Sequence, residues 1–157
     1  MTQVCTVLVL GDAMRGDDGA ALLAADHLEM AAVPDCRIWR LGQLGPDDLV
    51  AALSEGPCLV LDAVRGVPPG EVVERPLVRV ADTGGPQPAS SHALPPGVIV
   101  RLAAALGADL DMGTFVGIGG ERFELGEGIS PAVQRGLAGY ERAIARRLAA
   151  IGGATCA

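Results

Sequence analysis

Five of the acidic and histidine residues in this sequence are candidates for metal binding or acid–base chemistry. Asp12, Asp17 and Asp18 lie together in the stretch LVLGDAMRGDDG at residues 8–19, Asp62 follows the apolar run Leu-Val-Leu, and His92 lies in a polar stretch. Carboxylates and an imidazole form a hard-to-borderline ligand set suited to a divalent transition metal, and a carboxylate also serves as a general base. The sequence therefore predicts a metal or acid–base site if the fold brings these residues together.

Alternating short apolar runs and longer helical patterns indicate the elements that would position these residues. Strands are expected at residues 4–10, 37–41, 58–63, 71–78 and 112–118, with a short extension at 122–125. Helices are expected at residues 17–32, 46–53 and 96–106, and from the Ser130-Pro131 start signal onward. The turn at residues 66–70 is too short for a helical crossover, so the strand that follows it is expected to be antiparallel.

This alternation predicts an α/β fold, with residues 1–157 forming one domain. The expected architecture is a three-layer α/β/α sandwich whose mostly parallel sheet has about five strands, one of them antiparallel. In such sheets, ligands bind beyond the carboxyl ends of the strands, near the switch in strand order. Asp18 follows the first strand, Asp62 ends the third, and His92 lies in the loop at residues 81–96, so all three are expected at that edge.

Each candidate also has a purely structural interpretation. Asp12, Asp17 and Asp18 could cap the helix that follows them. A histidine in a polar loop, such as His92, is more often solvated than a ligand, and His27 lies on the helix face expected to be packed. Asp62 is harder to explain structurally, because a carboxylate after an apolar run is partly desolvated and needs a partner.

Composition excludes several classes of function. The 157 residues are 50% hydrophobic but include only four aromatic side chains, so the core must consist mainly of Leu, Val, Ile and Ala. A formal net charge of −7 argues against a nucleic-acid or anionic-membrane partner. All twelve basic residues are arginine, and the absence of lysine excludes Schiff-base chemistry and a Walker A lysine.

The cysteines and the N-terminal sequence indicate a cytoplasmic location. The four cysteines show no CxxC spacing, and Cys5, Cys36 and Cys58 lie in or beside apolar runs, as buried free thiols do. The N-terminal stretch lacks the basic region of a signal peptide, and no segment approaches the ~20 apolar residues of a membrane span. We therefore expect a cytoplasmic protein with reduced cysteines.

Common catalytic and cofactor motifs are missing from the candidate segments. LGDAMRGDDG does not match the dinucleotide-binding GxGxxG pattern, and His27 is not part of an HExxH zinc motif. Ser90 and Ser91 precede His92 without the GxSxG of a nucleophile elbow. No organic cofactor is therefore expected.

Four segments, in order, resemble the maturation endopeptidases of [NiFe] hydrogenases. They are LGDAMRGDDGAALLAADHL (10–28), LVLDAVRGVPPGEV (59–72), SSHALPPGVIVRLAAALG (90–107) and FVGIGGERFELGEGISPAV (115–133). The first looks like the family's G-N-x-x-R-G-D-[DE]-G loop, and the last is close to its V-G-I…G-x-G-[LI]-S-P-x-V ending. Together they span most of the chain from Thr6 to about Leu148.

The resemblance implies a fold, an activity and a set of site residues. Members of this family are α/β sandwiches that remove a C-terminal extension from the hydrogenase large-subunit precursor once nickel has been inserted. By motif, the metal-contacting and catalytic residues would be Asp18, Asp62 and His92. The nickel would belong to the precursor's own site, where it would serve as the recognition element. The implied partner is therefore the [NiFe] hydrogenase large-subunit precursor.

The sequence departs from the family pattern in two places. Asp12 stands where the family has an asparagine, which adds a negative charge that Arg15 could compensate. The family's D-G-G-T-x-G segment, associated with substrate choice, appears here as RLGQLG at residues 40–45, and only Gly42 and Gly45 match. These departures leave open a catalytically silent relative that binds the precursor as a chaperone. A receiver-like phosphoacceptor domain is a further alternative, although such domains need a lysine that this chain lacks.

Overall fold

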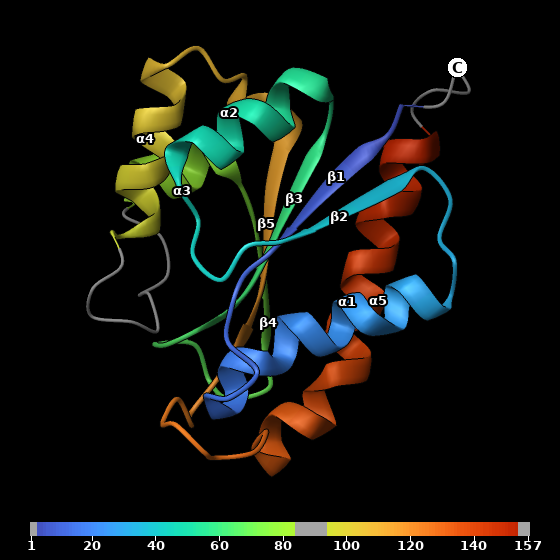
Figure 1. Cartoon of the computed structure of the whole chain (residues 1–157), viewed down its shortest axis with the longest axis vertical. Helices are drawn as coiled ribbons and strands as arrows, with labels where there is room; N and C mark the ends of the chain where they lie inside the picture. The colour runs from blue at the N-terminus through green and yellow to red at the C-terminus, as the bar shows by residue number, and fades with distance from the viewer. Residues whose placement is uncertain (1–2, 84–93, 154–157) are drawn as a thin grey trace.

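The structure is a computed structural model that describes residues 3–83 and 94–153 (Figure 1). The described residues form a five-stranded sheet with the strand order β2-β1-β3-β5-β4. The strands are β1 (Cys5–Val9), β2 (Cys36–Arg40), β3 (Cys58–Val64), β4 (Val72–Pro76) and β5 (Gly113–Gly119). The α-helices are α1 (Ala20–Met30), α2 (Pro46–Glu55), α3 (Leu77–Thr83), α4 (Pro96–Ala105) and α5 (Pro131–Gly153). Short 3₁₀ turns at Gly16–Gly19 and Leu110–Met112 precede α1 and β5.

The pairing of the strands confirms the expected mixed sheet. β1 is parallel to both β2 and β3, and β3 is parallel to β5. β4 is antiparallel to β5, as the short turn at residues 66–70 predicted. The chain runs from β1 to β2 on one side and then crosses to β3 on the other, so the order of the strands switches between β1 and β3.

The helices cover both faces of the sheet, which confirms the three-layer sandwich (Figure 1). Side chains of one strand alternate between the faces, so Val7 and Val9 pack against α1 and α5, whereas Leu8 packs against α2, α3 and α4. The core on each side consists mainly of Leu, Val, Ile and Ala, as the composition indicated. Among the described residues, no helix has both the length and the apolar character of a membrane span.

Two predicted elements differ from the structure. The strand expected at residues 71–78 ends at Pro76, and α3 follows at once. Leu77 and Val80 are one helical turn apart and both are 1% exposed, because they pack into the core beside α4. The β-branched composition of VVERPLVRV concealed this helical spacing. The extension expected at residues 122–125 is a loop rather than a strand.

Two individual residues also differ from expectation. β3 continues to Val64, so Asp62 lies inside the strand and not at its end. His27 is exposed and pairs with Glu141 of α5 instead of packing in the core.

The thiols of Cys5 and Cys58 are buried and free, as expected, and Cys36 is free and half-buried. The fourth cysteine, Cys156, lies outside the described residues.

The turn that connects β3 to β4 packs closely against α5. Gly70 has φ +84°, a conformation that favours glycine, and a Cβ at this position would lie 2.4 Å from the carbonyl oxygen of Ala132. A Cβ on Gly136, one turn further along α5, would lie 2.2 Å from the carbonyl oxygen of Gly70. The helix and the turn therefore approach each other backbone to backbone.

We expect Gly136→Ala to lower the free energy of unfolding by about 1–3 kcal/mol, because the added methyl group meets a backbone carbonyl that cannot move freely. The matched control is Gly139→Ala in the same helix, where the nearest atom is the end of the Arg142 side chain at 3.6 Å. The control is expected to stabilise the protein by up to about 1 kcal/mol through helix propensity. Urea denaturation measures the change in the free energy of unfolding for both variants. Equal changes would contradict the close approach of α5 to the turn at Gly70.

Candidate functional site

A cleft of about 1240 Å³ opens at the carboxyl ends of β1 and β3, beside the switch in strand order. Its lining has two chemical parts. One part is charged and contains Asp12, Arg15, Asp18, Asp62, Arg65 and Glu124. The other is apolar and contains Val60, Leu77, Val80, Ile99, Val100 and Phe115. Residues 42–46, after β2, form a further part of the wall.

The loop after β1 holds Asp18 at the cleft. Gly11 has φ +120°, and a Cβ there would lie 2.0 Å from the backbone oxygen of Asp18, so only glycine fits. The backbone N–H of Asp12 donates a hydrogen bond of 2.8 Å to Oδ2 of Asp18, and the N–H of Gly11 donates to the carbonyl of Gly42 at 3.1 Å. Asp18 is therefore fixed by the backbone that precedes it, and no helix-capping hydrogen bond is involved.

Asp12 shapes the same loop. Its Oδ1 accepts a hydrogen bond of 2.8 Å from the backbone N–H of Met14, which is the geometry of an Asx turn. Its Oδ2 lies 3.6 Å from Nε of Arg15. The exposed carboxylate thus has the partner that the sequence suggested, and its charge is offset in part by Arg15.

Asp62 is a carboxyl group in an unfavourable environment. Burial and the nearby charge of Asp18 raise the pKa of Asp62 to about 8. A hydrogen bond from the backbone of Ala63 lowers this pKa but does not offset the rise. The pKa of Asp18 is also raised, because burial outweighs the hydrogen bond from the Asp12 backbone and the charges of Arg15 and Arg65. The two carboxyl groups therefore lie close enough to repel each other when both are ionised.

This pair suits a divalent cation, because a cation would relieve both the repulsion and the desolvation. Within residues 3–83 and 94–153, however, no cluster of three His, Cys, Asp or Glu side chains could hold a metal ion. The predicted third ligand, His92, lies outside the described residues. Leu94 and Pro95, which follow it closely in sequence, line the same cleft. The structure thus brings Asp18 and Asp62 together, and the role of His92 stays a prediction.

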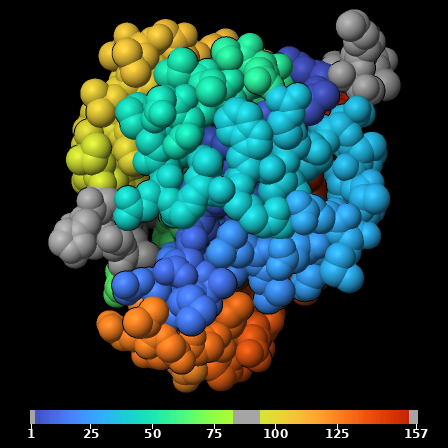
Figure 2. Space-filling model, in the orientation of Figure 1, coloured from blue at the N-terminus to red at the C-terminus, as the bar shows by residue number. Residues whose placement is uncertain are grey.

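Asp17 has a different role from its neighbour. It is fully buried, and its carboxylate accepts four hydrogen bonds: from the N–H of Glu121 (2.8 Å), the N–H of Arg122 (3.0 Å), and the N–H and hydroxyl of Ser130 (2.7 and 2.9 Å). Burial raises the pKa of Asp17, but these hydrogen bonds together lower it below its ordinary value. Asp17 does not cap α1. It joins the segment after β1 to the segment after β5, which lie against each other as blue and orange atoms in Figure 2.

Two further residues of the cleft were missed from the sequence. The guanidinium of Arg65, at the end of the DAVR sequence that contains Asp62, lies 4.3 Å from the ring centroid of Phe123. Both residues line the cleft. The only sequence signal was the position of Arg65 immediately after a strand that carries a candidate site residue.

We expect Asp17→Asn to lower the free energy of unfolding by about 1–3 kcal/mol at neutral pH, because an amide cannot accept all four hydrogen bonds. A carboxyl whose pKa is lowered by folding stabilises the protein above its unfolded pKa and loses this effect as the pH falls through its folded pKa. The difference between wild type and variant should therefore shrink as the pH falls below 3.8, the ordinary value. Urea denaturation as a function of pH measures this difference in the free energy of unfolding, and the exposed Asp12→Asn is the control. A difference that does not change with pH would contradict the lowered pKa of Asp17.

Asp62→Asn should have the opposite effect and stabilise the metal-free protein at neutral pH. Folding raises the pKa of Asp62, so the wild type loses stability as the pH rises from 3.8 to about 8, where the folded state must give up this proton. The amide has no such requirement. The melting temperature of the variant relative to wild type, measured in chelator, should increase across this range and level off above it. A constant difference would show that Asp62 ionises normally.

No family model matches the chain. Among solved structures, it is similar to the hydrogenase maturating endopeptidase HybD from E. coli, with a TM-score of 0.77 and 18% identity over 95% of this chain and 94% of that chain. It is also similar to the [NiFe] hydrogenase maturation protease HybD from Thermococcus kodakarensis, with a TM-score of 0.66 and 24% identity over 92% and 98%. The endopeptidase HycI from Escherichia coli matches with a TM-score of 0.68 and 21% identity over 88% and 87%. Over nearly its full length, this chain has the fold of the hydrogenase maturation endopeptidases.

Proposed function

We propose that this protein is an endopeptidase that removes the C-terminal extension of a [NiFe] hydrogenase large-subunit precursor after nickel insertion. The observation that carries the proposal is the meeting of Asp18 and Asp62 in one cleft, in a fold shared with proteins named as hydrogenase maturation endopeptidases. The absence of lysine from the chain disfavours the receiver-like alternative.

The cleft has the form that a peptide substrate requires. The apolar lining from β3, α3, α4 and β5 can bury the side chains of an extended segment, and the carboxyl groups lie at one part of the same cavity. Residues 42–46 also line the cleft, and they include most of the stretch in which the sequence departs from the family's substrate-choice segment. We assign that wall to recognition of the particular precursor.

The electrostatics of the pair support a proposed dependence of cleavage on nickel. Asp18 and Asp62 resist simultaneous ionisation, so a precursor without a cation gains little from docking against them. Nickel held by the precursor would supply the missing positive charge and would polarise the attacking water. Asp18, Asp62 and His92 would contact the metal, and one of the carboxylates would accept a proton from the attacking water. Cleavage would thereby follow metal insertion. Nickel belongs to the substrate in this scheme, and we place the reaction in the cytoplasm.

A second candidate is a catalytically silent relative that binds the precursor as a chaperone. Asp12 favours it, because this acid replaces the amide of the family motif and lies in the loop that holds Asp18. The two candidates differ in one result, since only the enzyme shortens the precursor.

The proposal predicts that the purified protein cleaves the nickel-loaded precursor and leaves the nickel-free precursor intact, with the large-subunit mass read by mass spectrometry. Asp18→Asn, Asp62→Asn and His92→Ala should each lower the cleavage rate by about 100-fold or more, as expected for loss of a metal contact or a general base. Circular dichroism should show that each variant retains its fold.

The matched control is Asp26→Asn, which alters an exposed aspartate of α1 that pairs with Arg40 away from the cleft. It should cleave at the wild-type rate. Full activity in all three site variants would refute the site. Binding of the loaded precursor without cleavage would favour the chaperone.

A further inference from the structure

Arg65 is a fixed positive charge in the acidic part of the cleft. It follows β3 directly, in the sequence Asp62-Ala63-Val64-Arg65, and lines the cleft together with Asp18 and Asp62. Its guanidinium carbon lies 4.3 Å from the ring centroid of Phe123, and Phe123 is only 5% exposed. A buried ring offers a rigid platform, and cation–π attraction favours a guanidinium placed over its face.

Arg65 shares the charged part of the cleft with the candidate site carboxylates of Asp18 and Asp62. Its positive charge therefore acts at the location where the peptide bond would be cleaved. Arg15 also lines the cleft, and both arginines are exposed residues. Arg65 differs in that its guanidinium lies over the buried ring of Phe123.

Peptide hydrolysis would place further negative charge at this location. Water adds to the carbonyl carbon, one of its protons passes to a site carboxylate, and the C=O electron pair moves onto the oxygen. The pair then returns as the C–N bond breaks, and the proton passes to the leaving nitrogen, which yields a carboxylic acid and an amine. An oxyanion beside Asp18 and Asp62 is strongly disfavoured unless a preorganised donor stabilises it.

We propose, on the basis of the proposed function above, that Arg65 is a catalytic residue that donates a hydrogen bond to the carbonyl oxygen of the scissile peptide as negative charge develops on it. Phe123 is the positioning residue that holds the guanidinium in place. The interaction is stronger in the transition state than with the neutral peptide, so it acts on kcat more than on KM.

The test compares cleavage of the nickel-loaded precursor by wild type, Arg65→Gln, Arg65→Lys and Arg65→Ala. Arg65→Gln should lower kcat by about 100-fold with KM nearly unchanged, as for loss of one oxyanion donor. Arg65→Lys keeps the positive charge but lacks the planar guanidinium group, so it should have a kcat between those of wild type and Arg65→Gln. Added guanidinium at non-denaturing concentration should restore part of the activity of Arg65→Ala, which a merely structural role would not produce.

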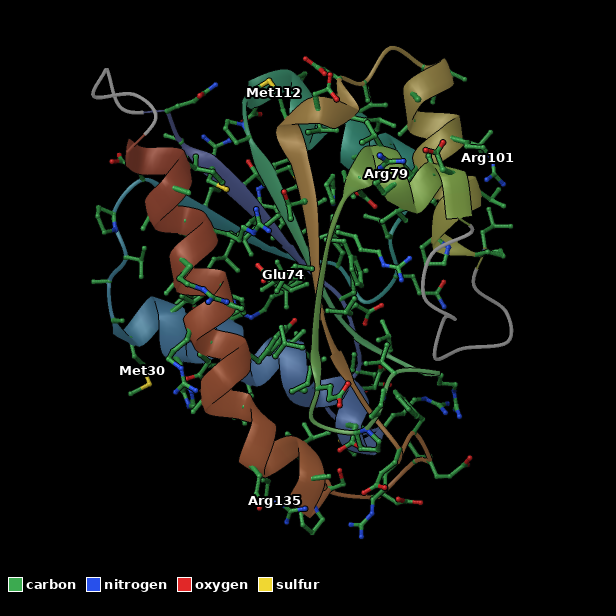
Figure 3. The ribbon with its side chains drawn as sticks, turned by 180° about the vertical axis from the view of Figure 1, so that it is seen from behind. Met30, Glu74, Arg79, Arg101, Met112 and Arg135 are labelled. Carbon is green, nitrogen blue, oxygen red and sulfur yellow. The ribbon has the colours of Figure 1, made fainter. Side chains whose placement is uncertain are left out.

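The matched control is Arg135→Gln, which removes the same charge from an exposed position near the start of α5, away from the cleft (Figure 3). It should leave kcat unchanged. Phe123→Leu retains an apolar side chain at the buried position but removes the aromatic face, and it should lower kcat less than Arg65→Gln does. Urea denaturation of each variant identifies any loss of fold.

The outcomes separate this inference from the proposed function. If wild type fails to cleave the loaded precursor, the proposed function fails and the role of Arg65 fails with it. If wild type cleaves and Arg65→Gln has the same kcat, or if Arg65→Gln raises KM alone, only the role of Arg65 is overturned. A guanidinium-rescued Arg65→Ala confirms it.

Discussion

The buried carboxylate of Asp17 is the interaction on which the candidate site depends. It accepts four hydrogen bonds from Glu121, Arg122 and Ser130, so it joins the segment after β1 to the segment after β5 and to the start of α5. This link also positions the residues that are adjacent in sequence to Asp17 and to its partners. Asp18 follows Asp17, and Phe123 follows Arg122, so the same carboxylate anchors the site acid and the ring that supports Arg65. Loss of this link would loosen both walls of the charged part of the cleft.

Asp17 and Asp62 show how one residue type stabilises the fold in one place and destabilises it in another. Burial opposes the charge of both, but Asp17 has four donors, whereas Asp62 has the carboxyl of Asp18 beside it. The pKa of Asp17 is therefore lowered, and that of Asp62 is raised to about 8. Asp17 stabilises the fold at neutral pH. Asp62 destabilises it there, and such a cost is typical of groups that are arranged for a ligand.

The sequence predicted the architecture and the meeting of Asp18 and Asp62 in one cleft, because both follow from local patterns and a topological rule. Apolar runs and the Ser130-Pro131 signal located most elements, and the carboxyl-end rule brought Asp18 and Asp62 together. Residues 77–78 were assigned wrongly to a strand, because tertiary burial decided between helix and strand in a β-branched segment. The role of Asp17 was missed for a related reason. A helix cap looks the same in sequence as an acceptor whose donors, from Glu121 onward, lie over a hundred positions away. No local pattern links Arg65 to Phe123 either.

The loop after β1 explains why acids occupy a place where nucleotide-binding folds bind phosphate. Gly11 brings the backbone against Asp18, whose carboxylate then accepts the N–H of Asp12 that a phosphate-binding loop would offer to its ligand. A site that already contains anions selects a cationic ligand. It also requires positive charge within the protein wherever its chemistry creates another anion, and this chain has only arginine to provide it. Under the proposed function, nickel in the precursor is the cationic ligand, and Arg65 supplies the positive charge within the protein. In that proposal, the repulsion between Asp18 and Asp62 would make cleavage conditional on a loaded metal, while the charge that assists bond breaking would stay with the protein.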